Sequence, residues 1–420
     1  MNVVMLNTSD IDGGAAKATY RLHKVIKSLG HESVYLVQSK KGIDKSVFGP
    51  IGKYNKLINF LRPYIDAFPL NLYKNRSINP WNVGWLRNNS MLRKIDKAYP
   101  DIIHLHWINA GYVPIRHIPK MGDKVVWTLH DSWSFTGGCN VPGNCMRYVE
   151  SCGKCPQLNS NMNYDLSRAI WERKKKHYSQ GNFTLVAPSK WMAECAGKSS
   201  LFYGKKIHII PNGLDTDLFK PVDKEYSREL LHLPKEKNLI LFGAMYSTED
   251  KNKGFDLLID SINKLNLSPN ETEIVIFGGD DTSKTNNLKY KVHNLGHIHN
   301  EEMMVALYSA ADVMCVPSRQ ESFGQTASES MSCGTPVVAF GATGLVDIVD
   351  HHKNGYLAEP FDTEDFSRGI EWILSHNINR DLSFSAREKV EKNFDIRITG
   401  KRYLELYEHL INQEKEMVQL

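Results

Sequence analysis

The sequence predicts an α/β protein built from two Rossmann-like, doubly wound domains that face each other across a cleft. The chain has 420 residues, which is long for a single core and suits two domains of roughly 200 residues each. Hydrophobic residues make up 41% of it and charged residues 24%, as in soluble globular proteins. Short apolar runs alternate with helical patterns in both halves, which indicates parallel sheets.

The first half, residues 1–214, begins with a strand-like run at 2–6. Residues 17–30 then carry apolar side chains at helical spacing and end at Gly30, a typical helix C-cap. Further β-rich runs stand at residues 33–38, 101–107, 124–130, 183–189 and 206–212. We therefore expect a first domain with a parallel sheet.

The polar, proline-containing stretch 212–238 has little strand signal and separates the two halves. The second half, residues 215–399, repeats the pattern, with a helix expected at 255–265. Its apolar runs stand at residues 238–245, 273–279, 307–318, 336–340 and 355–360. Residues 400–420 predict a helix that packs back onto the first domain. Because ligands bind at the carboxyl ends of parallel strands, we expect the functional residues in the loops after these runs.

The N-terminal stretch MNVVMLNTSD lacks the basic start and apolar core of a signal peptide, and no stretch approaches the roughly 18 apolar residues of a transmembrane helix. We therefore expect a cytoplasmic protein, either free or peripheral on the inner face of the membrane. Residues 51–75 mix aromatic, aliphatic and basic residues, which suits a membrane interface or an ordinary surface-packed insertion. The net charge of +5 is too mild to indicate a nucleic-acid partner, and the basic run 171–177 is typical of a solvated helix face.

The stretch 317–340 carries the most informative motif. A strand is expected to end at Val316 and a helix to begin near Gly324. Backbone N–H groups and the helix dipole at such a start favour a phosphate or diphosphate. Glu321 lies before the helix and Glu329 inside it, and carboxylates accept hydrogen bonds from sugar and ribose hydroxyls.

The string ESFG, four residues, then ESMSCGTPVVA resembles the donor-site motif of retaining family 4 glycosyltransferases, whose two Rossmann-like domains form the GT-B fold. VAPSKWMAE, IPNGLDTDLFKP and LFGAMYSTEDKNKGFDLLI are similar to other segments of that family, so the resemblance covers nearly the whole chain. HDSWSFTGGC followed by CGKCPQL resembles the capsular and exopolysaccharide (colanic-acid-type) members. The resemblance implies an acceptor domain at 1–214 and a nucleotide-sugar donor domain at 215–399.

The resemblance also implies roles for single residues. Glu321 would contact the transferred sugar and Glu329 the ribose. The backbone at the helix start would cradle the sugar and diphosphate through Ser322, Phe323, Gly324 and Gln325. Gly13 and Gly14 would let the first glycine loop approach the donor phosphates; because this loop is not a G-x-G-x-x-G motif, no dinucleotide cofactor is implied.

Two further catalytic candidates follow from the same resemblance. Lys253 would bind the diphosphate, and His130, which ends a strand, would contact the donor sugar. The chain departs from its relatives at Ala244, where they place an arginine, and Lys251 is a candidate substitute. The implied mechanism is a front-face displacement in which the leaving diphosphate helps to take the acceptor proton, so we expect no catalytic metal.

Four of the seven cysteines lie in the loop 137–157, with the spacing C-x5-C-x6-C-x2-C. They are Cys139, Cys145, Cys152 and Cys155. Only the last pair has the tight knuckle of structural zinc, so zinc, reduced thiols, and disulfides or an iron–sulfur cluster all stay open. A zinc with four cysteine ligands would have no open position for catalysis and would brace the loop. His104 and His106 share one strand face, and we expect them to pack at a strand end rather than bind a metal.

We therefore predict a retaining glycosyltransferase that moves a sugar from a UDP- or GDP-sugar to a saccharide or lipid-linked saccharide in surface polysaccharide biosynthesis. A nucleotide-sugar epimerase of the same fold and a non-catalytic zinc-loop binding protein are the alternatives. An epimerase would release free epimer without an acceptor, whereas a binding protein would keep its biological activity after Glu321→Ala.

Overall fold

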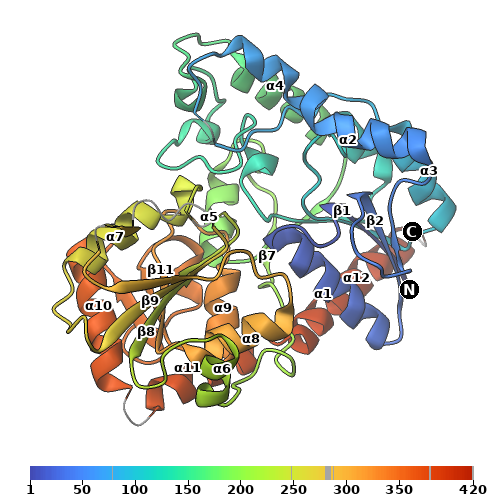
Figure 1. Cartoon of the computed structure of the whole chain (residues 1–420). Coiled ribbons are helices and arrows are strands. Elements are labelled where there is room, and N and C mark those ends of the chain that lie inside the picture. The colour runs from blue at the N-terminus through green and yellow to red at the C-terminus, as the bar shows by residue number, and fades with distance from the viewer. Residues whose placement is uncertain (78, 247, 280–284, 287, 378–379, 419–420) are drawn as a thin grey trace. The chain divides into compact units, whose positions relative to one another are not determined.

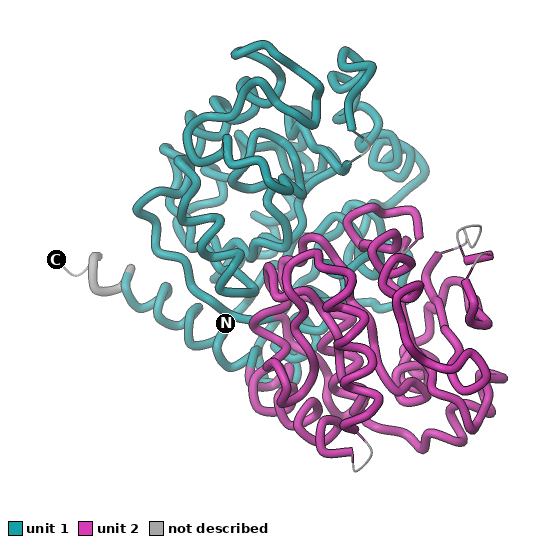
Figure 2. The backbone as a smooth tube through the Cα atoms, turned by 90° about the vertical axis from the view of Figure 1, so that its left-hand side faces the viewer, with its two compact units in different colours: residues 1–211, 399–420 teal, residues 212–398 magenta. Residues whose placement is uncertain are grey.

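The computed structural model of the chain describes residues 1–77, 79–246, 248–279, 285–286, 288–377 and 380–418. The chain forms two compact units (Figures 1 and 2). The first unit comprises residues 1–211 and 399–420, and the second comprises residues 212–398. Each unit is built on its own parallel sheet, which confirms the predicted α/β class with two Rossmann-like units.

The sheet of the first unit has seven strands in the order β3-β2-β1-β4-β5-β6-β7, and neighbouring strands are parallel. The strands are β1 (Asn2–Ser9), β2 (Glu32–Ser39), β3 (Val47–Phe48), β4 (Ile102–Leu105), β5 (Val125–Thr128), β6 (Thr184–Ala187) and β7 (Ile207–Ile209). The helices of residues 1–211 are α1 (Gly14–Ser28), α2 (Lys53–Ala67), α3 (Asn89–Ala98), α4 (Leu166–Tyr178) and α5 (Lys190–Lys198), with a 3-10 turn η1 (Phe68–Leu72) after α2. The order runs outward from β1 in both directions, which is the doubly wound arrangement.

The central strands of this sheet are buried on both faces. All residues of β4 and β5 are buried, as are all but the first of β1. Parallel strands covered on both faces read as continuous apolar runs, which is why the sequence signalled them so clearly. Just beyond β4, the N–H of Trp107 donates to the side chain of Asn7 at 2.8 Å, and the N–H of Thr8 donates to the carbonyl of Trp107 at 2.8 Å.

The last helix, α12 (Ile396–Val418), starts in the second unit, and its residues from Thr399 onward belong to the first unit. There, the Tyr407 hydroxyl lies 2.6 Å from Nδ1 of His104, and the Tyr403 hydroxyl lies 2.8 Å from Oγ1 of Thr128. His104 is fully buried at this contact. The C-terminal helix therefore completes the packing of β4 and β5.

The sheet of the second unit has six strands in the order β10-β9-β8-β11-β12-β13, and neighbouring strands are again parallel. The strands are β8 (Asn238–Gly243), β9 (Thr272–Phe277), β10 (Lys291–Asn294), β11 (Val313–Val316), β12 (Val337–Phe340) and β13 (Gly355–Ala358). The helices are α6 (Lys224–Leu230), α7 (Phe255–Asn263), α8 (Glu301–Ala310), α9 (Gln325–Ser332), α10 (Thr363–His376) and α11 (Asp381–Asn393). Within the described ranges, no helix of either unit is both long and apolar enough to cross a membrane.

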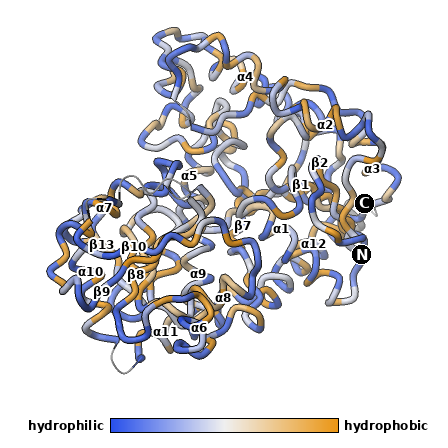
Figure 3. The backbone as a smooth tube through the Cα atoms, viewed as in Figure 1, coloured by the Kyte–Doolittle hydropathy of each residue, from blue (hydrophilic) through white to orange (hydrophobic). Residues whose placement is uncertain are grey.

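Two apolar cores cover the two faces of this second sheet. Leu241 and Val316 contribute to one core, whereas Phe242 and Cys315 contribute to the other. Successive side chains of a strand point to opposite faces, so neighbouring residues of β8 and β11 enter different cores. The strands accordingly appear as hydrophobic stretches in Figure 3.

Candidate active site

The loop after β11 and the start of α9 form the centre of the candidate site. The N-cap of α9 is Gly324, which has no side chain to cap the first turn of the helix. Its φ of 113° lies in the region that favours glycine, and a Cβ there would stand 2.6 Å from Cδ2 of Leu345. The backbone can thus turn sharply here and bring the first amides of α9, beginning at Gln325, to the carboxyl edge of the sheet. Such a helix start is suited to bind an anion.

Lys253 and Glu321 meet at this edge as an ion pair. Nζ of Lys253 lies 2.7 Å from Oε1 of Glu321, and both side chains are mostly buried. Burial by itself lowers the pKa of Lys253, but the Glu321 carboxylate outweighs it and holds that pKa above its usual value. The lysine is therefore a cation at neutral pH, beside the start of α9.

Backbone contacts fix the segment that carries Lys253 against the loop that carries Glu321. The 3-10 turn η6 (Lys251–Lys253) presents Asn252, whose side-chain amide donates to the carbonyl of Gln320 at 2.7 Å. The N–H of Arg319 donates to the carbonyl of Asn252 at 2.8 Å. These two bonds fix the η6 turn against the loop after β11 and so hold the two partners of the ion pair in place.

Arg319 is a further cation near the ion pair, and no sequence motif marks it. Its guanidinium makes two hydrogen bonds to Asp256, at 2.9 and 2.6 Å, and a third to the carbonyl of Lys251 at 2.6 Å. It therefore fastens the η6 turn rather than standing ready for a diphosphate. Ala244 is buried. The family resemblance implies an arginine at this position, and the replacement of that charge by Lys251 stays a prediction.

Glu329 lies inside α9 and is only 4% exposed. Its Oε2 accepts a hydrogen bond from the hydroxyl of Tyr308 at 3.1 Å. Tyr308 comes from α8, and no sequence pattern connects that helix with the motif. The predicted contact of Glu329 with a ribose stays a prediction.

In the first unit, Gly13 and Gly14 stand where β1 passes into α1. Gly13 is the N-cap of α1, with φ of 87°, and a Cβ at this position would meet nothing within 4 Å. Gly13 is thus required by the backbone conformation, and open space lies beside it. Gly14 is the first residue of the helix. Both lie at the carboxyl edge of the first sheet, and their predicted approach to phosphate stays a prediction.

His130 follows β5 and belongs to a row of three neighbouring histidine rings. Its Nε2 lies 2.9 Å from Nδ1 of His106, and the two rings stack with centroids 5.2 Å apart. The rings of His106 and His104 are 4.0 Å apart. Burial lowers the pKa of His130 to about 4, so this histidine is neutral at pH 7. His104 bonds to Thr128 and Tyr407, which agrees with the packed strand end that the sequence favoured.

Asp131, next to His130, is a residue whose role the sequence did not reveal. Its carboxylate accepts hydrogen bonds from the Trp107 indole at 2.6 Å, the Asn140 amide at 2.7 Å and the Trp133 backbone at 2.8 Å. Burial raises the pKa of Asp131 to about 6, against the opposing effect of these donors. Because Asn140 belongs to the cysteine loop, Asp131 ties that loop to the end of β5.

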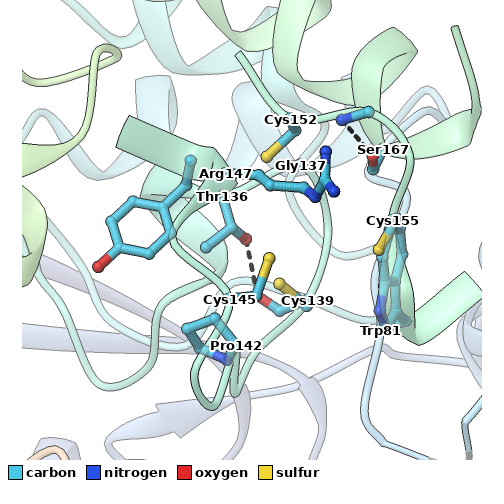
Figure 4. Close-up of a pocket in the computed structure, with 12 residues that line it drawn as sticks. Trp81, Thr136, Gly137, Cys139, Pro142, Cys145, Arg147, Cys152, Cys155 and Ser167 are labelled. Carbon is cyan, nitrogen blue, oxygen red and sulfur yellow. Dashed lines mark hydrogen bonds between the residues drawn. The ribbon is translucent and has the colours of Figure 1, made fainter. Parts of the chain in front are cut away.

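The four cysteines of the loop line a common cavity, together with Trp81 and Arg147 (Figure 4). All four are free thiols, and burial raises the pKa of Cys152 to about 12. The buried ammonium of Lys174 donates to the carbonyls of Trp133 and Thr136 nearby. Among the described residues, no three or more His, Cys, Asp and Glu side chains are already arranged to hold a metal ion. A structural zinc at this loop therefore stays a prediction.

Two family models match the chain. The one described as "Glycosyltransferase Family 4" matches residues 12–218, and the one described as "Glycosyl transferases group 1" matches residues 223–393. Together they match most of both units and include every residue proposed for the site.

Curated relatives carry the names of several transferases. D-inositol 3-phosphate glycosyltransferase of Xylanimonas cellulosilytica is 36% identical over 285 residues, which are 63% of this chain and 61% of that protein. Mannosylfructose-phosphate synthase of Agrobacterium fabrum is 33% identical over 178 residues, 38% of each chain. WcaC of Escherichia coli (strain K12), which carries the name of a colanic acid biosynthesis glycosyl transferase, is 24% identical over 81% of this chain and 83% of that protein.

Solved structures share the fold at low sequence identity. Sucrose-phosphate synthase from Thermosynechococcus elongatus has a TM-score of 0.71 at 19% identity, over 98% of this chain and 99% of that one. HepE from Anabaena, solved in complex with UDP-glucose, has a TM-score of 0.65 at 16% identity, over 97% of this chain and 100% of that one. The two family models, the named relatives and the shared fold agree, and WcaC adds a relative of the colanic-acid type. The chain is therefore an enzyme that belongs to the family 4 glycosyltransferases of the GT-B fold.

Proposed function

We propose that this glycosyltransferase moves a sugar, with retention of configuration, from a UDP- or GDP-sugar to a saccharide or lipid-linked saccharide in surface polysaccharide biosynthesis. The observation that carries the proposal is the Lys253–Glu321 ion pair beside the start of α9, whose N-cap Gly324 has no side chain. A cation, a carboxylate and a helix start together match a diphosphate joined to a sugar.

Each group has a distinct task in the proposed reaction. As the bond between the anomeric carbon and the diphosphate breaks, negative charge builds on the diphosphate, and Lys253 with the first amides of α9 stabilises it. Positive charge builds on the sugar ring, and the Glu321 carboxylate stabilises that charge and accepts hydrogen bonds from sugar hydroxyls. The leaving diphosphate oxygen takes the proton of the acceptor hydroxyl on the same face, so the new bond forms with retention.

The named relatives support glycosyl transfer and suggest which substrates to test first. HepE was solved with UDP-glucose, so UDP-glucose is the first donor to test. WcaC carries a colanic acid name, which favours a surface polysaccharide, whereas other relatives are named for inositol phosphate or mannosylfructose phosphate products. We therefore propose saccharide acceptors before phosphorylated polyols.

A donor panel followed by product analysis tests the proposal. One UDP- or GDP-sugar is expected to raise the melting temperature by mass action, and proton NMR of the product is expected to show the same anomeric configuration as the donor. Glu321→Gln is expected to lower kcat by about 100-fold or more, with little loss of donor binding. Glu364→Gln, an exposed glutamate in α10, serves as the matched control.

Three outcomes would contradict the proposal. They are an inverted product, a free epimer formed without an acceptor, and full activity of the Glu321→Gln enzyme.

A further inference from the structure

Helix α2 is packed with its polar side inward. Asp66 is 1% exposed, and its carboxylate accepts hydrogen bonds from the backbone N–H groups of Val83 and Gly84 at 3.0 Å. On the same side, Arg62 donates to the carbonyls of Gly111 at 2.9 Å and Arg87 at 2.7 Å. Ordinary surface helices of globular proteins bury their apolar side instead.

The opposite side of α2 presents large apolar side chains to solvent. This α2 face consists of Tyr54, Leu57, Phe60, Leu61, Tyr64 and Phe68, whose exposed fractions range from 40% to 76%. Their spacing is helical, so they form one continuous stripe along the helix and into the η1 turn that follows it. The helix runs along the outside of the first unit (Figure 1), and its sequence alternates between hydrophobic and hydrophilic residues (Figure 3). Single exposed apolar residues are common, but a stripe of six usually marks a binding surface.

The sequence around this face is strongly basic. Residues 46–95 contain eight Lys and Arg residues and one acidic residue, Asp66, which is the buried one. Lys53 and Lys56 stand on α2 itself and are exposed. An apolar stripe bordered by cations is the composition of helices that lie in the interface of an anionic membrane.

We infer that the α2 face docks this enzyme onto an anionic lipid bilayer, with α2 lying parallel to the membrane plane. Tyr54 and Tyr64 suit this position because their rings are apolar and their hydroxyls reach the wet headgroup layer. A second copy of the chain fits less well, because a twofold contact through this face would bring two excess-positive segments together. The inference goes beyond the proposed reaction and does not depend on the identity of the donor sugar.

Vesicle co-sedimentation of the full-length protein, without any donor sugar, tests the inference. The protein is expected to bind phosphatidylglycerol vesicles and to bind phosphatidylcholine vesicles at least about tenfold more weakly, since each lysine near the surface contributes about fivefold. Leu57→Gln with Phe60→Gln is expected to weaken binding to the anionic vesicles by about tenfold or more at an unchanged melting temperature. Tyr203→Gln, an 85% exposed aromatic of the first unit outside this face, is the matched control and is expected to bind like the wild type.

Several results would overturn the inference. One is equal binding to the two vesicle types, and another is equal loss in the Tyr203→Gln control. A third is a dimer in light scattering that the Leu57→Gln, Phe60→Gln change dissolves, because the face would then be an interface between two copies. Transfer to a water-soluble acceptor is expected to be unchanged in the double variant, so a failure of donor binding is distinguishable from a failure of membrane docking.

Discussion

Buried histidines couple the stability of this chain to pH in the acidic range. Burial is the largest cause that lowers the pKa of His23, His117 and His130, each to about 4. His104 and His106 also have pKa values well below the usual range, again chiefly because of burial. An unfolded histidine titrates near pH 6.5, so between about pH 6.5 and 4 the unfolded chain binds more protons than the folded chain. The stabilisation that the neutral, buried histidines contribute to the folded chain is therefore complete above about pH 6.5 and is lost as the pH falls towards 4.

Replacing His23 by Gln tests this coupling. The two ring nitrogens of His23 lie 2.8 Å from the hydroxyls of Ser33 and Ser46, and the ring is fully buried. His23→Gln is expected to reduce the slope of the unfolding free energy against pH by up to about 1.4 kcal/mol per pH unit between pH 4 and 6.5. Urea unfolding at several pH values measures it, with the exposed His409→Gln as control.

Asp131 opposes the histidines over part of the same range. Its pKa is raised to about 6, so the folded chain keeps this proton to a higher pH than the unfolded chain does, and the corresponding stabilisation is lost as the pH rises through 6. One opposing proton does not cancel the effect of several histidines.

The His23 test has a clear negative outcome. If His23→Gln leaves the slope of the unfolding free energy against pH unchanged, the His23 ring remains charged in the folded chain.

At the scale of elements, the turn between η6 and α7 depends on Gly254. Its φ is 72°, and a Cβ would collide with the carbonyl oxygen of Pro317. Gly254→Ala is expected to lower the unfolding free energy by about 1 kcal/mol because of the backbone conformation, and by about 1–3 kcal/mol more because of the collision. Gly296 in the same unit has a φ of 59°, and a Cβ there would meet no atom within 4 Å. Gly296→Ala is therefore expected to lower the unfolding free energy only by the backbone share, about 1 kcal/mol. Urea unfolding of both variants measures the difference, and equal losses would contradict the collision.

The cysteine loop carries the prediction of a structural zinc. A zinc bound by four thiolates has a net charge of −2. Burial lowers the pKa of Lys174 to about 7, whereas negative charge on Cys139 and Cys152 raises it, so a zinc-thiolate centre would favour the charged lysine, which would partly balance the centre. Metal analysis of protein purified under reducing conditions is expected to find about one zinc per chain. Chelation is expected to expose the loop to proteases before it affects donor binding, and Cys152→Ser is expected to do the same.

Cys315→Ser serves as the control for that experiment, because Cys315 lies in β11 of the second unit, away from the loop. Metal-free protein whose four loop thiols react freely, with unchanged protease resistance, would show that the cysteines act as reduced thiols.

The sequence predicted most strands but could not predict which of them meet. The run 2–6 extends to Ser9 in β1, and the run 307–318 divides into the end of α8 and the strand β11. Lys253 and Glu321 meet because β8 and β11 are neighbours in the sheet. Hydrophobic periodicity predicts single strands but not the order of strands in a sheet, so it could not predict this pairing. Asp131 was missed for a similar reason, since its donors come from the segment after β4, which carries Trp107, and from the segment after β5, which carries Trp133 and Asn140. Helix α2 turns its apolar side outward, whereas surface helices usually bury that side. The pattern at 51–75 was therefore compatible with both a membrane interface and a surface-packed insertion.

At the scale of the whole molecule, the units differ in whether their residues are contiguous in the chain. The second unit is one continuous segment, 212–398, whereas the first needs residues from 399 onward. A fragment of residues 212–398 is therefore expected to melt cooperatively, and a fragment of residues 1–211 is expected to lose cooperative melting. Without Tyr403 and Tyr407, the buried His104 and Thr128 lose their hydrogen-bond partners on α12.

Circular dichroism during heating of the two fragments measures this prediction. Adding residues 399–420 to the first fragment through a short flexible linker is the control, and it is expected to restore a cooperative transition. A fragment 1–211 that melts as sharply as the full-length chain would contradict the prediction.

The course of α12 also sets the order of events during biosynthesis. Residues 399–420 are synthesised after the whole of the second unit, yet they close the packing around His104 on a sheet whose strands were synthesised before that unit. The second unit is in effect inserted into the first, so it can finish folding while the earlier unit still waits for its final helix. Nascent chains are then expected to spend that interval with an uncovered apolar sheet face, which is the kind of surface that chaperones bind.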